Sequence, residues 1–491
     1  MVSENKHPKH IIMVILDTFM DEPFQRALKE ETLPAFNYFM ERAQYFPDMV
    51  SPFPTMSVNV ESSLLTGRYS DQHNVPALTW FHNKENRIIN YGTNAVELLK
   101  LGLSRSLYDS LYRLNNEHLN PELATIHEEL QRAGKTSASI NALVYRGAVR
   151  KTIKLPPLLR LFVNLDNTFS TSAPDIFTYG RLATYSRLRK YSQPWNKYGF
   201  NNDFSVQEFS YLVRERKLPD FTIVYLPDHD KNVHKFGPMN ITGIKQMDKQ
   251  LQAMLNSFPS WETALENNIW LLIGDNGQAV VHEKQKRALV DIRQILQSYQ
   301  IVKLRKGVRP NDQLALAMNL RSGFIYSLRP NNIPLRDIAA QLQKDSRIEV
   351  IAWKEQGWIH VLAGGKGESL QFSAAGELID PYQQAWTIQG DHTVLDLQVM
   401  GKRITFGDYP DAMMRLYSTL HSHAGDFLVA AVKPGYEFIS ESSPRHPNGA
   451  SHGGFHKNDS LIPLIVTGTS SKPEYLRVID IKDWIIRLMK E

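Results

Sequence analysis

The sequence predicts an α/β fold in which a mostly parallel central sheet is flanked by helices and joined to a smaller α+β insertion. Short apolar runs alternate along the chain with segments of helical periodicity, which is typical of parallel sheets with helical crossovers. Residues 302–408 depart from this pattern, because their polarity alternates more and they contain more Gly and Asn turns. The change indicates a second, smaller substructure.

Six apolar runs are expected to form buried strands of a parallel sheet. Such strands are covered on both faces and therefore read as continuous apolar stretches. The runs are HIIMVILD (10–17), SASINAL (137–143), FTIVYLPD (221–228), NIWLLIGD (268–275), FLVAAV (427–432) and LIPLIV (461–466).

Segments between these runs carry apolar residues at helical spacing, and we expect helices there. The segments are 32–46, about 58–66, 120–134, 244–258 and 409–420. The third is predicted to begin at Asn120-Pro121, with the proline in its first turn, and to stop at Gly134.

At 491 residues the chain is long enough for more than one domain. We predict a main domain formed by residues 1–301 and 409–491, with residues 302–408 inserted as an α+β cap. Residues 145–205 are rich in Arg, Tyr, Ser and Pro, and an irregular excursion over the active face is expected there.

Composition limits the classes of partner and location. The net charge of +5, spread over the whole chain, predicts no surface for a nucleic-acid polymer. The chain has no Cys, and its first apolar run is short and ends in Asp17. No run reaches the roughly 18 apolar residues of a membrane span. These features predict a cytoplasmic protein without an integral membrane segment.

The strongest local excess of positive charge can be read as a solvated face or as attraction for an anionic substrate or membrane surface. It comprises Arg146, Arg150, Lys151, Lys154 and Arg160.

Carboxylates and histidines follow several of the predicted strands. Asp17 ends the first strand, and Asp275 and Asn276 end the strand at 268–275; Asp230 and His234 flank a short loop after a third. His452 and His456 lie in a Gly-rich loop before LIPLIV. Each also has a structural interpretation, as a helix cap, a turn or a loop residue. Their gathering at one sheet edge favours a site for Zn²⁺ or Mn²⁺.

Four motifs together resemble the type I phosphodiesterase/nucleotide pyrophosphatase branch of the alkaline phosphatase superfamily. They are VILD, FPTMS…LLTGRYSDQHNV, PDHDKNVHKFGP, and GDNG with the later SHGG. The resemblance covers most of the chain outside 302–408. It implies an alkaline phosphatase-like sandwich and hydrolysis of a small-molecule phosphodiester, pyrophosphate or phosphomonoester.

The resemblance also implies two divalent metal ions, expected to be Zn²⁺, with a hydroxyl nucleophile between them and a covalent phosphoserine intermediate. Ser57 matches the nucleophile, with Thr55 as the alternative. One implied metal site comprises Asp17, Asp275, Asn276 and the shared Ser57. The other comprises Asp230, His234 and His452. Asp228 is a rival for Asp230, but only Asp230 lies four residues before His234.

Two positions depart from the family pattern. Asn276 stands where the family usually has His, which makes Mn²⁺, Mg²⁺ or Ca²⁺ possible at the Asp17/Asp275/Asn276 site. Val60 stands where these enzymes often have an Asn that contacts phosphate, and Asn59 is the candidate substitute. Alternative functions are a phosphomutase or phosphotransferase of the same superfamily, a sulfatase-like hydrolase with one metal, and a non-catalytic anion-binding relative.

Overall fold

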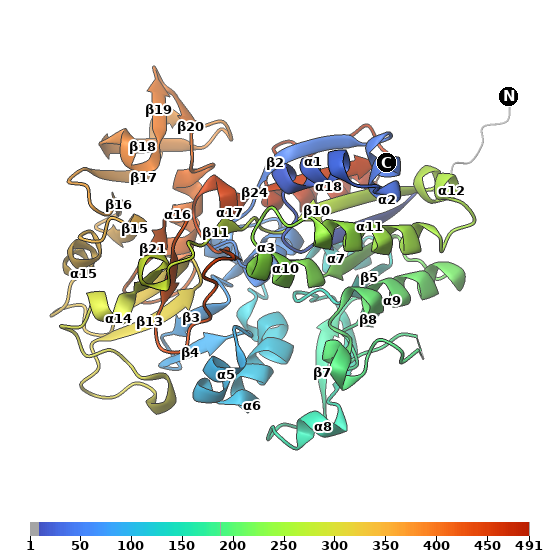
Figure 1. Cartoon of the computed structure of the whole chain (residues 1–491), viewed down its shortest axis with the longest axis horizontal. Coiled ribbons are helices and arrows are strands. Elements are labelled where there is room, and N and C mark those ends of the chain that lie inside the picture. Colours follow the sequence, from blue (N-terminus) through green and yellow to red (C-terminus); the bar gives the residue numbers. More distant parts are fainter. Residues whose placement is uncertain (1–8, 187, 491) are drawn as a thin grey trace.

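The computed structural model describes residues 9–186 and 188–490, and contains two large sheets that lie side by side (Figure 1). The strands of the first, central sheet are, in spatial order, β2 (Gln44–Val50), β24 (Leu461–Thr467), β10 (Asn268–Gly274), β1 (His10–Leu16), β9 (Phe221–Leu226), β5 (Ser137–Ile140) and β8 (Ile176–Thr178).

This central sheet is mostly parallel, as predicted. β1 pairs in parallel with β10 and β9, and β5 pairs in parallel with β9 and β8. Only β24 runs against its neighbours β10 and β2 among the described strands of the sheet. LIPLIV is therefore a buried strand of the predicted sheet, but an antiparallel one, because an apolar run shows burial and not direction.

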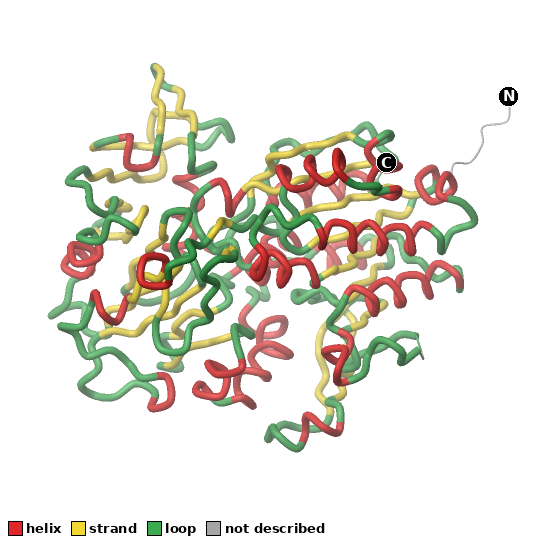
Figure 2. Tube along the Cα trace, viewed as in Figure 1, coloured by secondary structure: helices red, strands yellow, loops and turns green. Residues whose placement is uncertain are grey.

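Helices cover both faces of the central sheet, as the tube coloured by secondary structure shows (Figure 2). Alternate residues of β1 enter different cores: Ile12 and Val14 one, Ile11 and Met13 the other. The first core is closed by α1 (Asp21–Glu30), α2 (Pro34–Met40), α9 (Asn202–Arg214), α11 (Thr242–Leu255) and α12 (Trp261–Glu266). The second is closed by α3 (Ser57–Thr66), α7 (Ile126–Arg132), α16 (Ala412–His421) and α18 (Ile481–Leu488).

The second sheet is built mainly from residues 302–408 and is antiparallel apart from one contact between β17 and β20. Its strands follow the order β13 (Leu314–Asn319), β14 (Ser322–Ser327), β21 (Phe427–Val432), β15 (Ile348–Glu355), β16 (Trp358–Leu362), β17 (Ser369–Ile379), β20 (Arg403–Phe406) and β19 (Leu397–Met400), with β18 (Ala385–Gly390) beside β17. The division into a main domain and an inserted cap stays a prediction.

One strand lies in a different sheet from the one expected. FLVAAV forms β21, which pairs with β14 and β15 in the second sheet. Its consecutive residues Phe427 and Leu428 point to opposite faces and enter different cores, so the strand is buried on both faces. Full burial is the signature of a parallel strand, and here an internal antiparallel strand produces it.

The two sheets share one continuous core and a buried ion pair. Phe324 and Val429 of the second sheet belong to the same cluster as Met13 of β1. Arg321, between β13 and β14, is fully buried, and its Nε lies 2.9 Å from Asp459 Oδ1. The second sheet is thus joined to the polypeptide that leads into β24.

Shorter elements complete the described fold. The strand pairs are β3 (Thr79–His82) with β4 (Arg87–Asn90), β6 (Val149–Lys154) with β7 (Thr168–Ala173), β11 (Ala279–Val280) with β23 (Ala450–Ser451), and β12 (Leu289–Asp291) with β22 (Glu437–Ile439). The remaining helices are α4 (Ser70–His73), α5 (Ala95–Leu101), α6 (Leu103–Tyr108), η1 (Asp109–His118), α8 (Pro157–Arg160), η2 (Pro194–Gly199), α10 (Asp228–Phe236), α13 (Gln285–Ala288), α14 (Ile292–Ile295), η3 (Leu304–Lys306), α15 (Leu335–Leu342), η4 (His392–Leu395), α17 (Lys457–Ser460) and η5 (Val478–Asp480).

Three local expectations were wrong. The helix expected over 32–46 ends at Met40, because Gln44 begins β2 and pairs with β24. The helix expected from Asn120 begins at Ile126, where Thr125 and Glu128 form a capping box. Residues 145–205, expected to be irregular, contain the β6–β7 hairpin, the edge strand β8 and the start of α9.

Candidate active site

A cavity of about 740 Å³ lies at the carboxyl edge of the central sheet. Five of the residues predicted to form a site line it: Asp17, Ser57, Asp230, His234 and His452. Asp275 and Asn276 are almost completely buried beside this lining.

Parallel strands bring the acidic residues together. Leu16 is in register with Gly274 of β10 and with Leu226 of β9, so the three strands end at the same level. Asp17 and Asp275 are the next residues after β1 and β10. Asp230 follows β9 within α10, so the loop expected between Asp230 and His234 is instead a helix in which they are one turn apart.

Ser57 is the first residue of α3, and its hydroxyl donates to Asp275 Oδ2 at 2.8 Å. Thr55, the alternative nucleophile, is fully buried. Its Oγ1 accepts from the Gly453 amide at 2.9 Å, and its carbonyl accepts from His452 Nδ1 at 2.9 Å. Ser57 therefore faces the cavity, whereas Thr55 is part of the packing behind it.

Asp17, Asp275 and Asn276 form an oxygen-rich group. Thr18 connects them: its amide donates to Asp275 Oδ1 at 2.9 Å, and its hydroxyl lies 3.2 Å from Asn276 Oδ1. Burial, and then the charges of Asp275 and Asp230, raise the pKa of Asp17 well above its usual range. Burial also raises the pKa of Asp275 to about 6. Such crowding of carboxylates is unfavourable without a neutralising cation.

Asp230, His234 and His452 form the second group, whose potential ligand atoms all lie within 4.8 Å of one another. The Nε2 atoms of His234 and His452 are 3.3 and 3.7 Å from Asp230 Oδ1. Both Nδ1 atoms lie against carbonyl oxygens, at 2.8 Å from Ala450 and 2.9 Å from Thr55. A carbonyl only accepts, so each Nδ1 donates a proton, and in the neutral form of each ring Nε2 presents its lone pair.

Two other predicted positions are placed away from the cavity lining. Asn59 is fully buried in α3 and donates to the Pro54 carbonyl at 2.9 Å; its role in substrate binding stays a prediction. Asp228 accepts from Lys197 Nζ at 2.7 Å and from the Asn202 amide at 2.8 Å, so it is engaged outside the acidic cluster.

The sequence interpretation missed several residues that hold the site. Gln278 Nε2 donates to Asp230 Oδ1 at 2.6 Å, and the Tyr225 hydroxyl donates to Asp17 Oδ2 at 2.7 Å. His446 lines the cavity and stacks on His234 with ring centroids 4.1 Å apart. Gln278 lies directly beside the GDNG motif, which was the one available signal; nothing in the sequence marks Tyr225 or His446.

A family model for type I phosphodiesterase/nucleotide pyrophosphatase matches residues 11–456. The chain belongs to this family. It is a hydrolase acting on phosphoric ester bonds, which confirms the family and the class of enzyme predicted from the motifs. A comparison with curated proteins found no match.

Solved structures similar to this phosphodiesterase family member include murine and human ectonucleotide pyrophosphatase/phosphodiesterase 5. Each has a TM-score of 0.57 at 13% identity, covering 98% of this chain and 95% of the other. An inactive threonine-to-alanine variant of the murine protein, in complex with AMP, has a TM-score of 0.57 at 12% identity and covers 99% and 95%. At such low identity the likeness shows a common fold.

Across residues 9–186 and 188–490 of this phosphodiesterase family member, no helix is long and apolar enough to cross a membrane.

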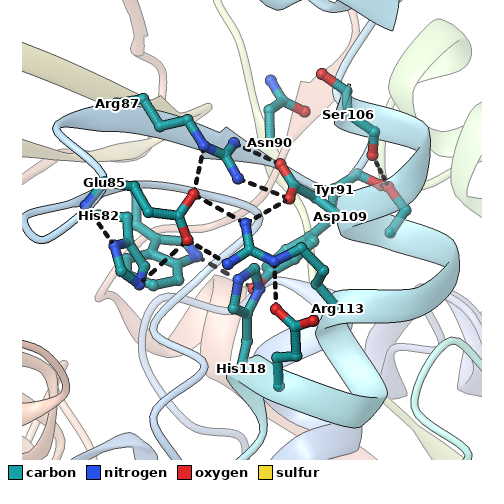
Figure 3. Close-up of polar contacts among 12 residues, drawn as sticks. His82, Glu85, Arg87, Asn90, Tyr91, Ser106, Asp109, Arg113 and His118 are labelled. Carbon is teal, nitrogen blue, oxygen red and sulfur yellow. Dashed lines mark hydrogen bonds and ion pairs between the residues drawn. The ribbon is translucent and has the colours of Figure 1, made fainter. Parts of the chain in front are cut away.

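Ion pairs join the β3–β4 hairpin, which lies beside the cavity, to η1 (Figure 3). Leu78 precedes the β3–β4 hairpin and Thr93 follows it, and both line the cavity. Arg87 of this hairpin binds the Asp109 carboxylate with both Nη atoms, at 2.6 and 2.8 Å. Arg113, one turn further along η1, lies 3.2 Å from Asp109 and also pairs with Glu85. The hairpin is therefore fixed to η1.

Replacing Asp109 by Ala should lower the free energy of unfolding by about 2 kcal/mol, because Arg87 and Arg113 would lose the buried carboxylate between them and keep only the more exposed Glu85 in common. The Asp109 side chain is only 1% exposed. Chemical denaturation monitored by circular dichroism would measure the change. Arg26→Ala breaks an exposed pair with Glu30 and should leave stability almost unchanged. Equal losses in both variants would contradict this role of Asp109.

Proposed function

We propose that this protein is a metal-dependent hydrolase of a small-molecule phosphate ester, with Ser57 as the nucleophile and a covalent phosphoserine intermediate. The observation that carries the proposal is the position of the Ser57 hydroxyl. It faces the cavity from the start of α3 and hydrogen-bonds a carboxylate that belongs to the acidic cluster.

Both donor groups fit divalent cations. The carboxylate and two imidazoles of Asp230, His234 and His452 are a ligand set suited to Zn²⁺. Asp17, Asp275, Asn276 and Ser57 offer oxygen only, which suits Mn²⁺, Mg²⁺ or Ca²⁺ as well. Asp17 Oδ1 is buried and has no hydrogen-bond partner among the described residues, which supports a cation next to it.

When bound, such cations lower the pKa of a coordinated hydroxyl or water and offset charge on phosphoryl oxygens. The chain's own residues do the positioning. Asp275 accepts the hydrogen bond of the Ser57 hydroxyl and orients it, and Tyr225 orients Asp17 by its hydrogen bond. The first turn of α3 places partial positive charge where the phosphoryl group would lie. Transfer to Ser57 would break the ester bond to the leaving group, and water would then hydrolyse the phosphoserine.

A nucleotide is the first substrate class to test, because a structural relative is described in complex with AMP. A cavity of about 740 Å³ falls within the range of small-ligand sites. We expect the purified protein to release product from a generic aryl phosphodiester, an aryl phosphomonoester or a nucleotide pyrophosphate, with added Zn²⁺, Mn²⁺ or Ca²⁺. Elemental analysis would show whether two metals are bound per chain.

The same assays separate the alternatives. A phosphotransferase would transfer the phosphoryl group to an added alcohol and release little phosphate without it. A sulfatase-like enzyme would cleave an aryl sulfate and contain one metal. A chain that binds no metal and cleaves no ester would contradict the proposed hydrolase and favour an anion-binding role.

Replacing Asn276 by His should raise the zinc content of the Asp17/Asp275 site, because imidazole is a better ligand for Zn²⁺ than an amide oxygen. Asn276 is fully buried, and in the part of the chain that the structure describes its Nδ2 has no hydrogen-bond partner, so the side chain can be exchanged without breaking a donated bond. Elemental analysis after dialysis at limiting zinc would measure the change. Unchanged content would argue that Asn276 lies outside the metal site.

A further inference from the structure

The hairpin formed by β6, α8 and β7 projects from the body of the protein, with α8 at its tip (Figure 1). Ile153 and Leu155, near the end of β6 that leads to α8, are fully buried in a small core with Tyr145 and anchor the hairpin. The proposed phosphate ester site uses no side chain of this hairpin. Its surface must therefore be explained separately.

The tip exposes large apolar side chains. Leu158, Leu161 and Phe162 are 47%, 77% and 67% exposed, although their neighbour Val163 is only 7% exposed. Exposed apolar residues are common singly, but three within five positions at a projecting tip form a compact apolar point. Because α8 lies at the projecting end of the hairpin, these side chains are placed to insert into a surface (Figure 1).

Cations lie along the hairpin up to this apolar tip. Of the basic residues noted in the sequence, Arg146 precedes the hairpin and pairs with Glu128. The others, Arg150, Lys151, Lys154 and Arg160, lie on the hairpin and have no carboxylate partner among the described residues. Asp166 is the only acidic residue between 146 and 173. The basic excess is therefore not neutralised within the hairpin.

One face of the hairpin combines these cations with hydroxyl groups. Arg150 is paired across the ladder with Ser172, and Lys154 with Thr168. The Arg150 guanidinium contacts the hydroxyls of Ser170 and Ser172, both at 3.1 Å. Cations and hydroxyls are the groups that bind phosphate oxygens.

We propose that this hairpin binds the surface of an anionic phospholipid membrane. Leu158, Leu161 and Phe162 would enter the boundary between headgroups and acyl chains, as the apolar faces of interfacial anchors do. Lys154 and Arg160, next to the tip, would lie at the level of the lipid phosphates, and Arg150, further along β6, would add to the attraction to the anionic surface. The protein would then be held at a membrane through this tip.

Flotation with lipid vesicles tests this surface. The full chain should float with phosphatidylcholine vesicles that contain roughly a quarter phosphatidylglycerol, and dissociate at about 1 M salt. Leu161→Ser combined with Phe162→Ser should weaken binding by at least about 10-fold. Met400→Ser, which alters a residue 73% exposed in the second sheet, is the matched control and should bind like the parent chain. Circular dichroism would verify that each variant is folded.

Charge variants complete the test. Lys154→Gln should weaken vesicle binding by about 5-fold, since each basic residue near an anionic surface adds a comparable increment. Hydrolysis of a soluble ester should stay unchanged in the tip and charge variants. Absence of flotation by the parent chain, or equal loss in the Met400 control, would overturn the proposal. Binding to immobilised poly-glutamate but not to vesicles would also overturn it, in favour of an acidic protein partner.

Discussion

Replacing Ser57 by Ala should lower kcat for a phosphate ester by at least about 10³-fold, because it removes the proposed attacking oxygen. The fold should persist, since the side chain faces the cavity and contributes no core volume. Steady-state kinetics together with a thermal melt would separate lost chemistry from lost structure.

Thr55→Ala is the matched control for this experiment. It should keep kcat within about 10-fold of the parent. It should cost about 2 kcal/mol of stability, because the buried Gly453 amide would lose its acceptor. The reverse outcome, with activity lost in Thr55→Ala and retained in Ser57→Ala, would move the nucleophile to Thr55.

Replacing Asp230 by Ala should remove one divalent cation per chain and lower kcat/KM by at least about 10²-fold. Asp230 is the single carboxylate of the group that includes His234 and His452, and it lies within 4 Å of both imidazoles. Elemental analysis and steady-state kinetics on the same preparation would measure the two effects together.

Asp228→Ala provides the comparison for Asp230, two residues earlier on the same helix. Its carboxylate pairs with Lys197 outside the cluster, so metal content and kcat/KM should stay close to the parent values. Metal content unchanged in Asp230→Ala, or lost equally in both variants, would contradict the assignment of Asp230 as a ligand.

The position of the residues that follow the strands was predictable, because parallel neighbouring strands end at the same edge of a sheet. Once β1 and β10 are recognised as buried strands, Asp17 and Asp275 must lie at one edge of the sheet. The family motifs then added Ser57 and His452, which lie far away in the sequence. The fold class and the gathering of these side chains thus followed from local patterns.

Other features depended on tertiary contacts. The sequence of a strand that is buried on both faces does not indicate which sheet it joins, so β21 was expected in the central sheet and lies in the second sheet. Gln278 and Tyr225 act through single hydrogen bonds to Asp230 and Asp17, and isolated bonds have no sequence periodicity. The hydrophobic pattern reports burial, whereas pairing and hydrogen bonding depend on three-dimensional placement.

The buried Arg321 connects the second sheet to the loop that carries His452. Besides its pair with Asp459, its backbone amide donates to the carbonyl of His452 at 3.1 Å. The loop that places the His452 imidazole at the cavity is therefore fixed by the turn between β13 and β14 of the second sheet. Exchanging or deleting loops within residues 302–408 would therefore also change the position of His452.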